Sequence, residues 1–179
     1  MMRDIKKVLL TEEQILEKVK ELGSVISKDY EGKDLLIVGI LKGSVIFGSE
    51  LIKNITIPCE IDFMAVSSYG NSTETSGVVR ILKDLEHSIE GKDIIIVEDI
   101  IDSGVTLDYL LKYLKARKAN SVEIVTLLTK PSRRKIDINV KYCGFEVPDE
   151  FLVGYGLDYA EKYRNLPYVG ILKEEVYKK

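Results

Sequence analysis

Three stretches of this chain, residues 35–41, 94–97 and 122–128, consist almost entirely of hydrophobic residues. Short continuous apolar runs are typical of strands that helices cover on both faces, because such strands have no solvent-facing positions. Helical spacing of apolar residues predicts helices over 45–53 and 105–116, after the first two runs. Strand, helix and strand in succession indicate a right-handed parallel crossover, so we expect an α/β fold with a central parallel sheet flanked by helices.

Polar positions and glycines mark the ends of the other predicted elements. Thr11 begins the pattern of a capping box, which predicts a helix that starts there and stops at Gly23. A long strand is expected over 57–68, with a returning strand over 78–85. Residues 69–77 between them are small and polar and cannot bury themselves, so we expect a mobile loop.

Composition restricts the class of protein further. With 179 residues, no linker and 45% hydrophobic residues, the chain is expected to form one domain over 1–179. A net charge of −3 does not suggest a nucleic-acid partner, and no apolar run approaches the ~20 residues of a membrane span. Cys59 and Cys143 are expected to be reduced packing residues of a cytoplasmic protein. His87, the single histidine, lies in a charged turn and is expected to be exposed, which excludes histidine-based catalysis.

An acidic segment follows the second apolar run. Glu98, Asp99 and Asp102 precede Ser103-Gly104-Val105-Thr106, which opens the predicted helix. Ligands of parallel sheets bind beyond the carboxyl ends of the strands, and free amides at a helix start favour phosphate. Carboxylates instead suit ribose hydroxyls, a hard cation or a proton to be moved. The combination therefore favours a phosphorylated sugar, although Asp102 could also simply cap the helix.

Other phosphate-binding patterns are absent or differ. Gly32-Lys33 and Gly91-Lys92 are each followed by Asp, so neither is a P-loop. Lys42-Gly43-Ser44 joins the first buried strand to a predicted helix, and its amides suit a second anion. The alternative is an ordinary strand-to-helix turn.

Segment 97–106 resembles the phosphoribosyl-pyrophosphate (PRPP) signature of type I phosphoribosyltransferases. The Asp at position 102 resembles their purine-salvage branch, the hypoxanthine or hypoxanthine-guanine enzymes, and the resemblance extends over 36–172. It implies the type I fold, with a small hood subdomain built from N-terminal and C-terminal segments and a flexible hairpin loop at about 69–77. It implies Mg²⁺-dependent transfer of the phosphoribosyl group from PRPP to N9 of hypoxanthine, and of guanine, giving IMP or GMP and pyrophosphate. It also implies a homodimer or homotetramer.

The same resemblance implies a role for individual residues. Asp102 would be the general base that takes the N7 proton of the purine. The residues that bind the nucleotide phosphate and ribose would be Glu98, Asp99, Asp102, Ser103, Gly104, Val105 and Thr106. The pyrophosphate contacts would be Leu41, Lys42, Gly43, Ser44, Ser68, Tyr69 and Arg164. The purine base would contact Ile101, Lys130, Phe151 and Leu152. One or two Mg²⁺ ions would be held by Glu98, Asp99 and Asp158.

Each of these assignments has an alternative in the sequence. Lys130 could be the first charge of a solvated basic run over 130–135, and Phe151 could be a core residue. Asp158 or Arg164 could instead belong to a surface ion pair. A nucleotide- and RNA-binding regulator on the same fold, an adenine or uracil transferase, and a non-enzymatic nucleotide-binding module are alternative functions. The sequence leaves open the preference among hypoxanthine, guanine and xanthine, and whether the Leu41-Lys42 peptide is cis.

Overall fold

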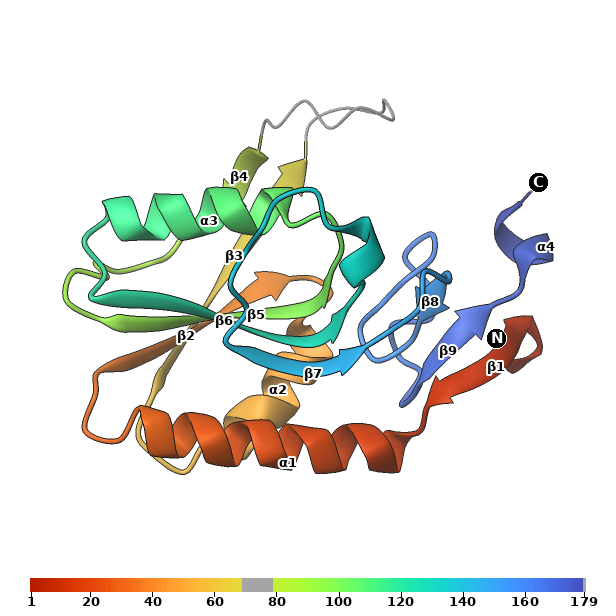
Figure 1. Ribbon diagram of the computed structural model, residues 1–179, viewed down its shortest axis with the longest axis horizontal. Helices are drawn as coiled ribbons and strands as arrows, with labels where there is room; N and C mark the ends of the chain where they lie inside the picture. The colour runs from red at the N-terminus through yellow and green to blue at the C-terminus, as the bar shows by residue number, and fades with distance from the viewer. Residues whose placement is uncertain (69–78, 179) are drawn as a thin grey trace.

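A computed structural model describes residues 1–68 and 79–178, and its centre is a six-stranded sheet with helices on both faces (Figure 1). The strand order is β4-β3-β2-β5-β6-β7, and β4 alone runs antiparallel to its neighbour within the described residues. The strands are β2 (Leu35–Leu41), β3 (Glu60–Ser68), β4 (Val79–Lys83), β5 (Asp93–Ile101), β6 (Ser121–Thr129) and β7 (Tyr142–Glu146). Helices α1 (Glu12–Asp29) and α2 (Val45–Lys53) cover one face, and α3 (Val105–Ala116) covers the other. The predicted fold class is confirmed.

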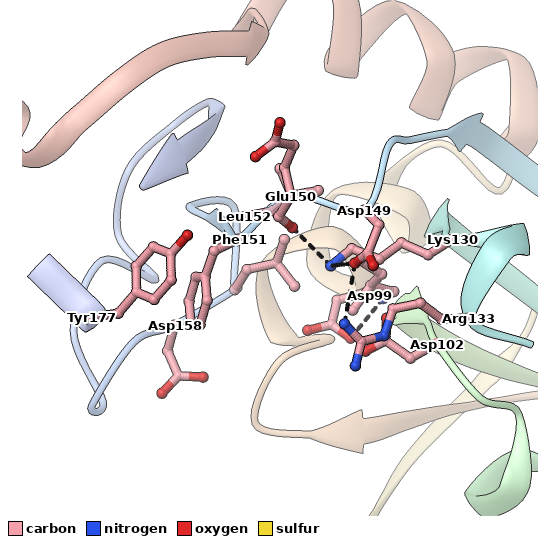
Figure 2. A pocket seen from close by; sticks show the side chains of 12 residues that line it. Asp99, Asp102, Lys130, Arg133, Asp149, Glu150, Phe151, Leu152, Asp158 and Tyr177 are labelled. Carbon is pink, nitrogen blue, oxygen red and sulfur yellow. Dashed lines mark hydrogen bonds and ion pairs between the residues drawn. The ribbon is translucent and has the colours of Figure 1, made fainter. Parts of the chain in front are cut away.

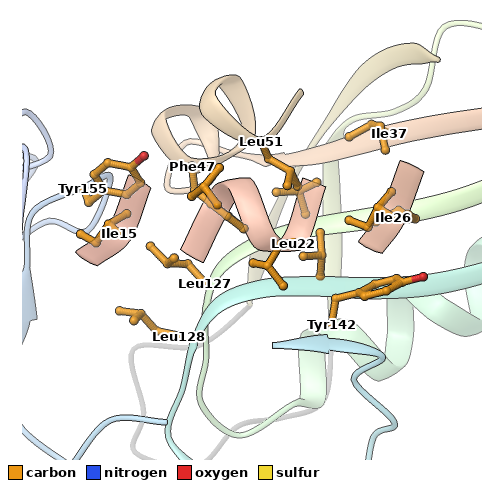
Figure 3. Packing of buried hydrophobic residues seen from close by; sticks show 14 of the residues in the cluster. Ile15, Leu22, Ile26, Ile37, Phe47, Leu51, Leu127, Leu128, Tyr142 and Tyr155 are labelled. Carbon is orange, nitrogen blue, oxygen red and sulfur yellow. The ribbon is translucent and has the colours of Figure 1, made fainter. Parts of the chain in front are cut away.

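The central strands are buried on both faces, as their continuous apolar sequence predicts. Ile95 and Val97 of β5 pack in the cluster beneath α1 and α2, whereas Ile94 and Ile96 pack in the cluster beneath α3. Figure 3 shows the α1–α2 side, where side chains of both helices meet those of the sheet. Burying each such aliphatic side chain stabilises the fold by about 1.5–3 kcal/mol. These layers hold the strand ends, and hence the segments that follow them, in fixed positions.

Several predicted bounds agree with the structure and others differ. Strand 35–41 and helices 45–53 and 105–116 are found at the predicted residues. The strand predicted over 94–97 extends to Ile101, because its ladder with β6 continues through the acidic residues. The strand predicted over 57–68 begins only at Glu60, and β4 ends at Lys83 rather than at residue 85.

The prediction that the first helix stops at Gly23 was wrong. The capping box of Thr11 and Gln14 is present, but α1 continues to Asp29. Gly23 lies against Asn54, the residue that follows α2, and a Cβ at position 23 would be 2.5 Å from the Asn54 carbonyl oxygen. The glycine therefore permits the two helices to approach closely instead of ending the first one.

A second, three-stranded antiparallel sheet stands beyond the carboxyl ends of the central strands (Figure 1). Its order is β1 (Ile5–Leu10), β9 (Val169–Leu172) and β8 (Leu152–Val153), so both ends of the described chain contribute to it. The short elements that complete the described chain are η1 (Met2–Asp4), η2 (Pro131–Arg133) and α4 (Glu174–Tyr177). Below we call β1, β8, β9 and α4 the hood. Among the described residues, no helix is long and apolar enough to cross a membrane.

Candidate active site

A cavity of about 570 Å³ lies between the carboxyl ends of the central strands and the hood (Figure 2). The central sheet and the segments after its strands contribute Asp99, Ile100, Asp102, Lys130 and Arg133. The chain around the hood contributes Asp149, Glu150, Phe151, Leu152, Leu157, Asp158 and Tyr177. The position is the usual one for ligands of open parallel sheets, because the strand ends bring residues from distant parts of the sequence together.

Glu98 and Asp99 lie in the last residues of β5, so the acidic pair belongs to the strand and not to the loop after it. Both side chains are half-buried. Burial raises the pKa of the Glu98 carboxyl well above its usual value, and the neighbouring charge of Asp99 raises it further. Burial also raises the pKa of Asp99, although a hydrogen bond from the Ile100 amide (2.7 Å) and the charge of Arg164 oppose this. Two crowded carboxyls favour a bound cation or hydroxyl donors.

A smaller cavity of about 280 Å³ surrounds the N-terminus of α3. Asp102, Ser103, Gly104 and Thr106 line it, as a phosphate-binding loop requires. Gly104 is the N-cap with φ +85°, and a Cβ there would lie 2.7 Å from Ile138 Cδ1. The N-terminus of α3 has no cap hydrogen bond from a side chain. Asp102 is exposed and borders both cavities. The alternative of Asp102 as a helix cap is therefore wrong.

The loop after β2 lies against Asp99. The Leu41-Lys42 peptide is cis, which answers the question that the sequence left open. A Cβ on Gly43 would overlap Asp99 Oδ2, and one on Gly156 would overlap the Gly43 carbonyl oxygen. Three segments distant in sequence thus meet closely, through the Asp99 side chain on one side of Gly43 and the backbone of Gly156 on the other.

Ser44 does not take the expected position. Its side chain is completely buried, and its amide donates to the Ile40 carbonyl at 3.3 Å. Neither group is presented to a ligand, so the prediction that Ser44 contacts pyrophosphate is not supported in this conformation. Among the other predicted contacts, Ser68 ends β3 and Tyr69 lies outside the described residues.

Asp158, which lines the larger cavity, pairs with Arg164. Arg164 Nη2 lies 3.3 Å from Asp158 Oδ1, and Arg164 Nη1 donates to the Gly156 carbonyl at 2.6 Å. Glu161 approaches the same guanidinium at 3.5 Å and also binds Lys42 at 2.9 Å. Within the described residues, no three acidic, histidine or cysteine side chains gather as a metal cluster. Glu98, Asp99 and Asp158 are therefore not a preformed cage.

The part of the cavity predicted to bind the base carries a buried cation and an aromatic ring. Lys130 is 8% exposed, and its Nζ donates to the Glu150 carbonyl at 2.8 Å. Phe151 borders the cavity beside Leu152 and stacks on Tyr177, with 4.6 Å between ring centroids. Lys130 is therefore buried and not part of a solvated run, whereas Phe151 both packs against the hydrophobic cluster of the hood and lines the cavity.

The assignment of Ile101 to the base is corrected by the structure. Ile101 is 1% exposed, packs in the cluster beneath α3 and borders only the smaller cavity. Neighbouring residues of a strand point to opposite faces, so Ile100 lines the larger cavity in its place.

Other residues near the cavity were not found from the sequence. Neither Tyr177, which contacts Phe151, nor Glu161, which contacts Lys42, belongs to a motif that the sequence analysis found. His87 is exposed, as predicted. Both cysteines are free, but Cys143 is exposed rather than packed in the core.

Comparison with known proteins agrees with this geometry. The phosphoribosyl transferase domain model matches residues 7–160. Hypoxanthine-guanine phosphoribosyltransferase of Bacillus subtilis (strain 168) is 59% identical over 177 residues, which cover 99% of this chain and 98% of the relative. The enzyme of the same name from Staphylococcus aureus (strain Mu50) is 60% identical, with 99% of each chain covered. A crystal structure of a hypoxanthine phosphoribosyltransferase from Staphylococcus aureus superimposes with a TM-score of 0.98 and 59% identity, covering 100% of this chain and 97% of that one. The chain therefore belongs to the phosphoribosyltransferase family, in its hypoxanthine-guanine branch.

Proposed function

We propose that this enzyme transfers the 5-phosphoribosyl group of PRPP to N9 of hypoxanthine or guanine, releasing pyrophosphate and forming IMP or GMP. One observation carries the proposal. Asp102 and Lys130 border a single cavity that Phe151 closes on the hood side, and the phosphate-binding loop of α3 lies directly beside it. A carboxylate can accept a proton from a 6-oxopurine, a cation can bind its oxygen, and an aromatic side chain can stack on its ring.

Lys130 supports the choice of a 6-oxopurine. Its ammonium group is a donor without acceptor capacity, so it suits the O6 oxygen of hypoxanthine or guanine. The amino group of adenine would place a donor against a donor, which disfavours that base. The existing bond to the Glu150 carbonyl holds the Lys130 side chain in the cavity while a second donor hydrogen remains for the base.

Asp102 supports the proton transfer. The side chain is exposed at the cavity and makes no cap bond to α3. In our proposal it accepts the N7 proton as N9 attacks the ribose C1. A positioned general base typically contributes about 10²–10⁴-fold to the rate.

Cations around the β2 loop support the departure of pyrophosphate. Lys42 and Arg164 share the carboxylate of Glu161, so both positive groups lie where a polyanion could replace that carboxylate. Negative charge builds on the leaving oxygens, and fixed cations would stabilise it.

The acidic pair fits the Mg²⁺ that we propose as the metal. Carboxylate oxygens are its preferred ligands, and Mg²⁺ is usually held by one or two carboxylates together with substrate oxygens. Glu98 and Asp99 supply such a pair, and their raised pKa values indicate that a cation would relieve their crowding. When bound, Mg²⁺ would stabilise negative charge on the leaving group. Asp158 could hold a second ion after releasing Arg164.

We also propose a homodimer or homotetramer in the cytoplasm. The exposed apolar side chains Val45 and Ile46 on α2 support an interface, and two free thiols fit a reducing compartment. Light scattering during size-exclusion chromatography would give the number of subunits.

The activity is tested by steady-state kinetics with hypoxanthine, guanine, xanthine and adenine, each with and without Mg²⁺. We expect pyrophosphate release with hypoxanthine and guanine, little with adenine, and a loss of turnover when the metal is chelated. Turnover of adenine equal to that of hypoxanthine would refute the role of Lys130. No turnover with any base would refute the function.

A further inference from the structure

The ring of Tyr177 stacks on the ring of Phe151. The centroids are 4.6 Å apart and the planes differ by 26°. Tyr159 meets the same phenylalanine edge-on, with centroids 5.5 Å apart and planes at 86°. Both geometries are favourable arrangements of aromatic pairs. Phe151 is thus held by two tyrosines that come from later parts of the chain.

The hood fixes Tyr177 in this position. Strand β9 pairs with β1, and the Leu172 amide at its end donates to the Phe151 carbonyl at 2.8 Å. The Lys173 amide then donates to the Asp4 carbonyl at 2.9 Å, and α4 begins directly afterwards. The backbone that carries Tyr177 is therefore bonded both to Phe151 itself and to the N-terminal segment.

Tyr177 lies on the side of Phe151 that is remote from Lys130 (Figure 2). In Figure 1 the hood lies beyond the carboxyl ends of the central strands, and α4 is its outermost element. Tyr177 and Phe151 border the cavity from the hood side, whereas Lys130 and Asp102 border it from the segments after the sheet strands. The tyrosine covers one face of the ring and leaves the other toward the cavity.

We propose that Tyr177 is a positioning residue for the purine base, which acts by backing Phe151. This inference rests on the proposed function, in which the base stacks on Phe151. Without the ring of Tyr177, the Phe151 side chain could rotate away from the cavity. Binding of the base would then have to order that side chain, which lowers the affinity. Tyr177 would thus set the affinity for the base while the chemical step, which depends on Asp102, stays unchanged.

The test compares Tyr177→Ala, Tyr177→Leu and Tyr177→Phe, with Lys178→Ala as control. Lys178 is the next residue and forms only an exposed ion pair with Glu174. We expect Tyr177→Ala to raise KM for hypoxanthine about fivefold, the size of one lost aromatic contact, with kcat and KM for PRPP unchanged. Tyr177→Phe should restore the parent value, because it keeps the ring, and Tyr177→Leu should restore it in part.

A double-mutant cycle with Phe151→Leu shows whether Tyr177 acts through Phe151. In the Phe151→Leu background, Tyr177→Ala should have no further effect on KM for the base. A full additional fivefold effect would overturn the inference, as would an unchanged KM in Tyr177→Ala. A fall of the melting temperature together with equal losses in all kinetic parameters would also overturn it, because that pattern indicates a structural role alone.

Calorimetric binding of IMP separates failure of this inference from failure of the proposed function. If the parent protein turned over no base, the proposed function would fail, yet Tyr177→Ala should still weaken IMP binding about fivefold and Tyr177→Phe should not. Equal IMP affinity in the parent and Tyr177→Ala would refute the positioning role whichever way the activity assay came out.

Discussion

Lys42 and Glu161 are 119 positions apart in the sequence and form an ion pair of 2.9 Å beside the candidate active site. The same carboxylate reaches Arg164 at 3.5 Å. The hydrogen bond and positive charge of Lys42 hold the pKa of Glu161 below its usual value, so this carboxyl stays ionised. The two cations that we propose bind pyrophosphate are therefore both paired with an internal anion.

We predict that Glu161→Gln strengthens binding of PRPP and pyrophosphate. Removing the internal carboxylate frees both cations, and an exposed ion pair of this kind is expected to change affinity by about two- to fivefold. Calorimetric titration of pyrophosphate measures the effect. Glu174→Gln, which breaks the exposed pair with Lys178 at 3.0 Å, is the matched control and should change nothing. Weaker binding in Glu161→Gln would mean that Glu161 orders the cations for the ligand instead of competing with it.

Asp102→Asn should lower kcat by about 10²–10⁴-fold with little change in either KM, because the amide cannot accept the N7 proton. Single-turnover formation of IMP would measure the chemical step directly. Asp108→Asn is the control, since that carboxyl lies on the same helix and pairs only with Lys112 at 2.8 Å. Near-full turnover in Asp102→Asn would eliminate Asp102 as the base.

Lys130→Met should raise KM for hypoxanthine about 10- to 100-fold. Methionine keeps most of the side-chain volume but removes the donor, and a hydrogen bond to a charged group is worth about 1.5–3 kcal/mol. The matched control is Lys135→Met, in the same basic run but exposed and outside the cavity. Steady-state kinetics at saturating PRPP provides the measurement, and an unchanged KM would remove Lys130 from base recognition.

Gly43→Ala should destabilise the protein and abolish most activity, because its Cβ would overlap Asp99 Oδ2 and displace a half-buried carboxyl. Such overpacking typically costs about 1–3 kcal/mol. Gly48→Ala is the control: its Cβ would meet Val97 Cγ1 at an ordinary 3.7 Å, and alanine favours the helix. Thermal unfolding and pyrophosphate release should be measured for both variants. Equal behaviour of the two would show that the contact between Gly43 and Asp99 is not needed.

Acid stability should depend on Asp84. Burial alone would raise the pKa of Asp84, but the Tyr113 hydroxyl, the Leu85 amide and Arg117 together lower it below 3.8. A lowered folded-state pKa adds stability at neutral pH that is lost as the pH falls through that value. Tyr113→Phe should therefore lower the melting temperature at pH 7 by about 2–4 °C, equivalent to about 1 kcal/mol at this partly exposed site.

The difference between Tyr113→Phe and the parent should shrink as the pH is lowered below about 4, where Asp84 becomes protonated in the unfolded chain. Thermal melts between pH 3 and 7 give the comparison, and Tyr109→Phe on the same helix is the control. A difference that stays constant across this range would show that the hydroxyl acts independently of the Asp84 charge.

The central strands and the acidic segment could be predicted because their signals are local. A continuous apolar run such as 35–41 indicates a strand buried on both faces whatever its partners are. A continuous apolar run does not show, however, toward which face of the sheet each side chain points. Ile95 and Val97 pack toward α1 and α2, and regular alternation would place Ile101 with them. Ile101 packs toward α3 instead, so the alternation breaks around the acidic pair, and nothing in an all-apolar pattern could reveal that.

By itself, the sequence determined the fold class, the position of the proposed phosphate-binding loop and the residue types proposed for the chemistry, because each depends on neighbours within about ten positions along the chain. Only the tertiary structure decided which of these residues meet. The backing of Phe151 by Tyr177, the overlap of Gly43 with Asp99 and the pairing of Glu161 with two cations all join distant segments. Such contacts depend on how the hood packs against the sheet, and contacts between distant segments produce no repeating pattern of residues in the sequence.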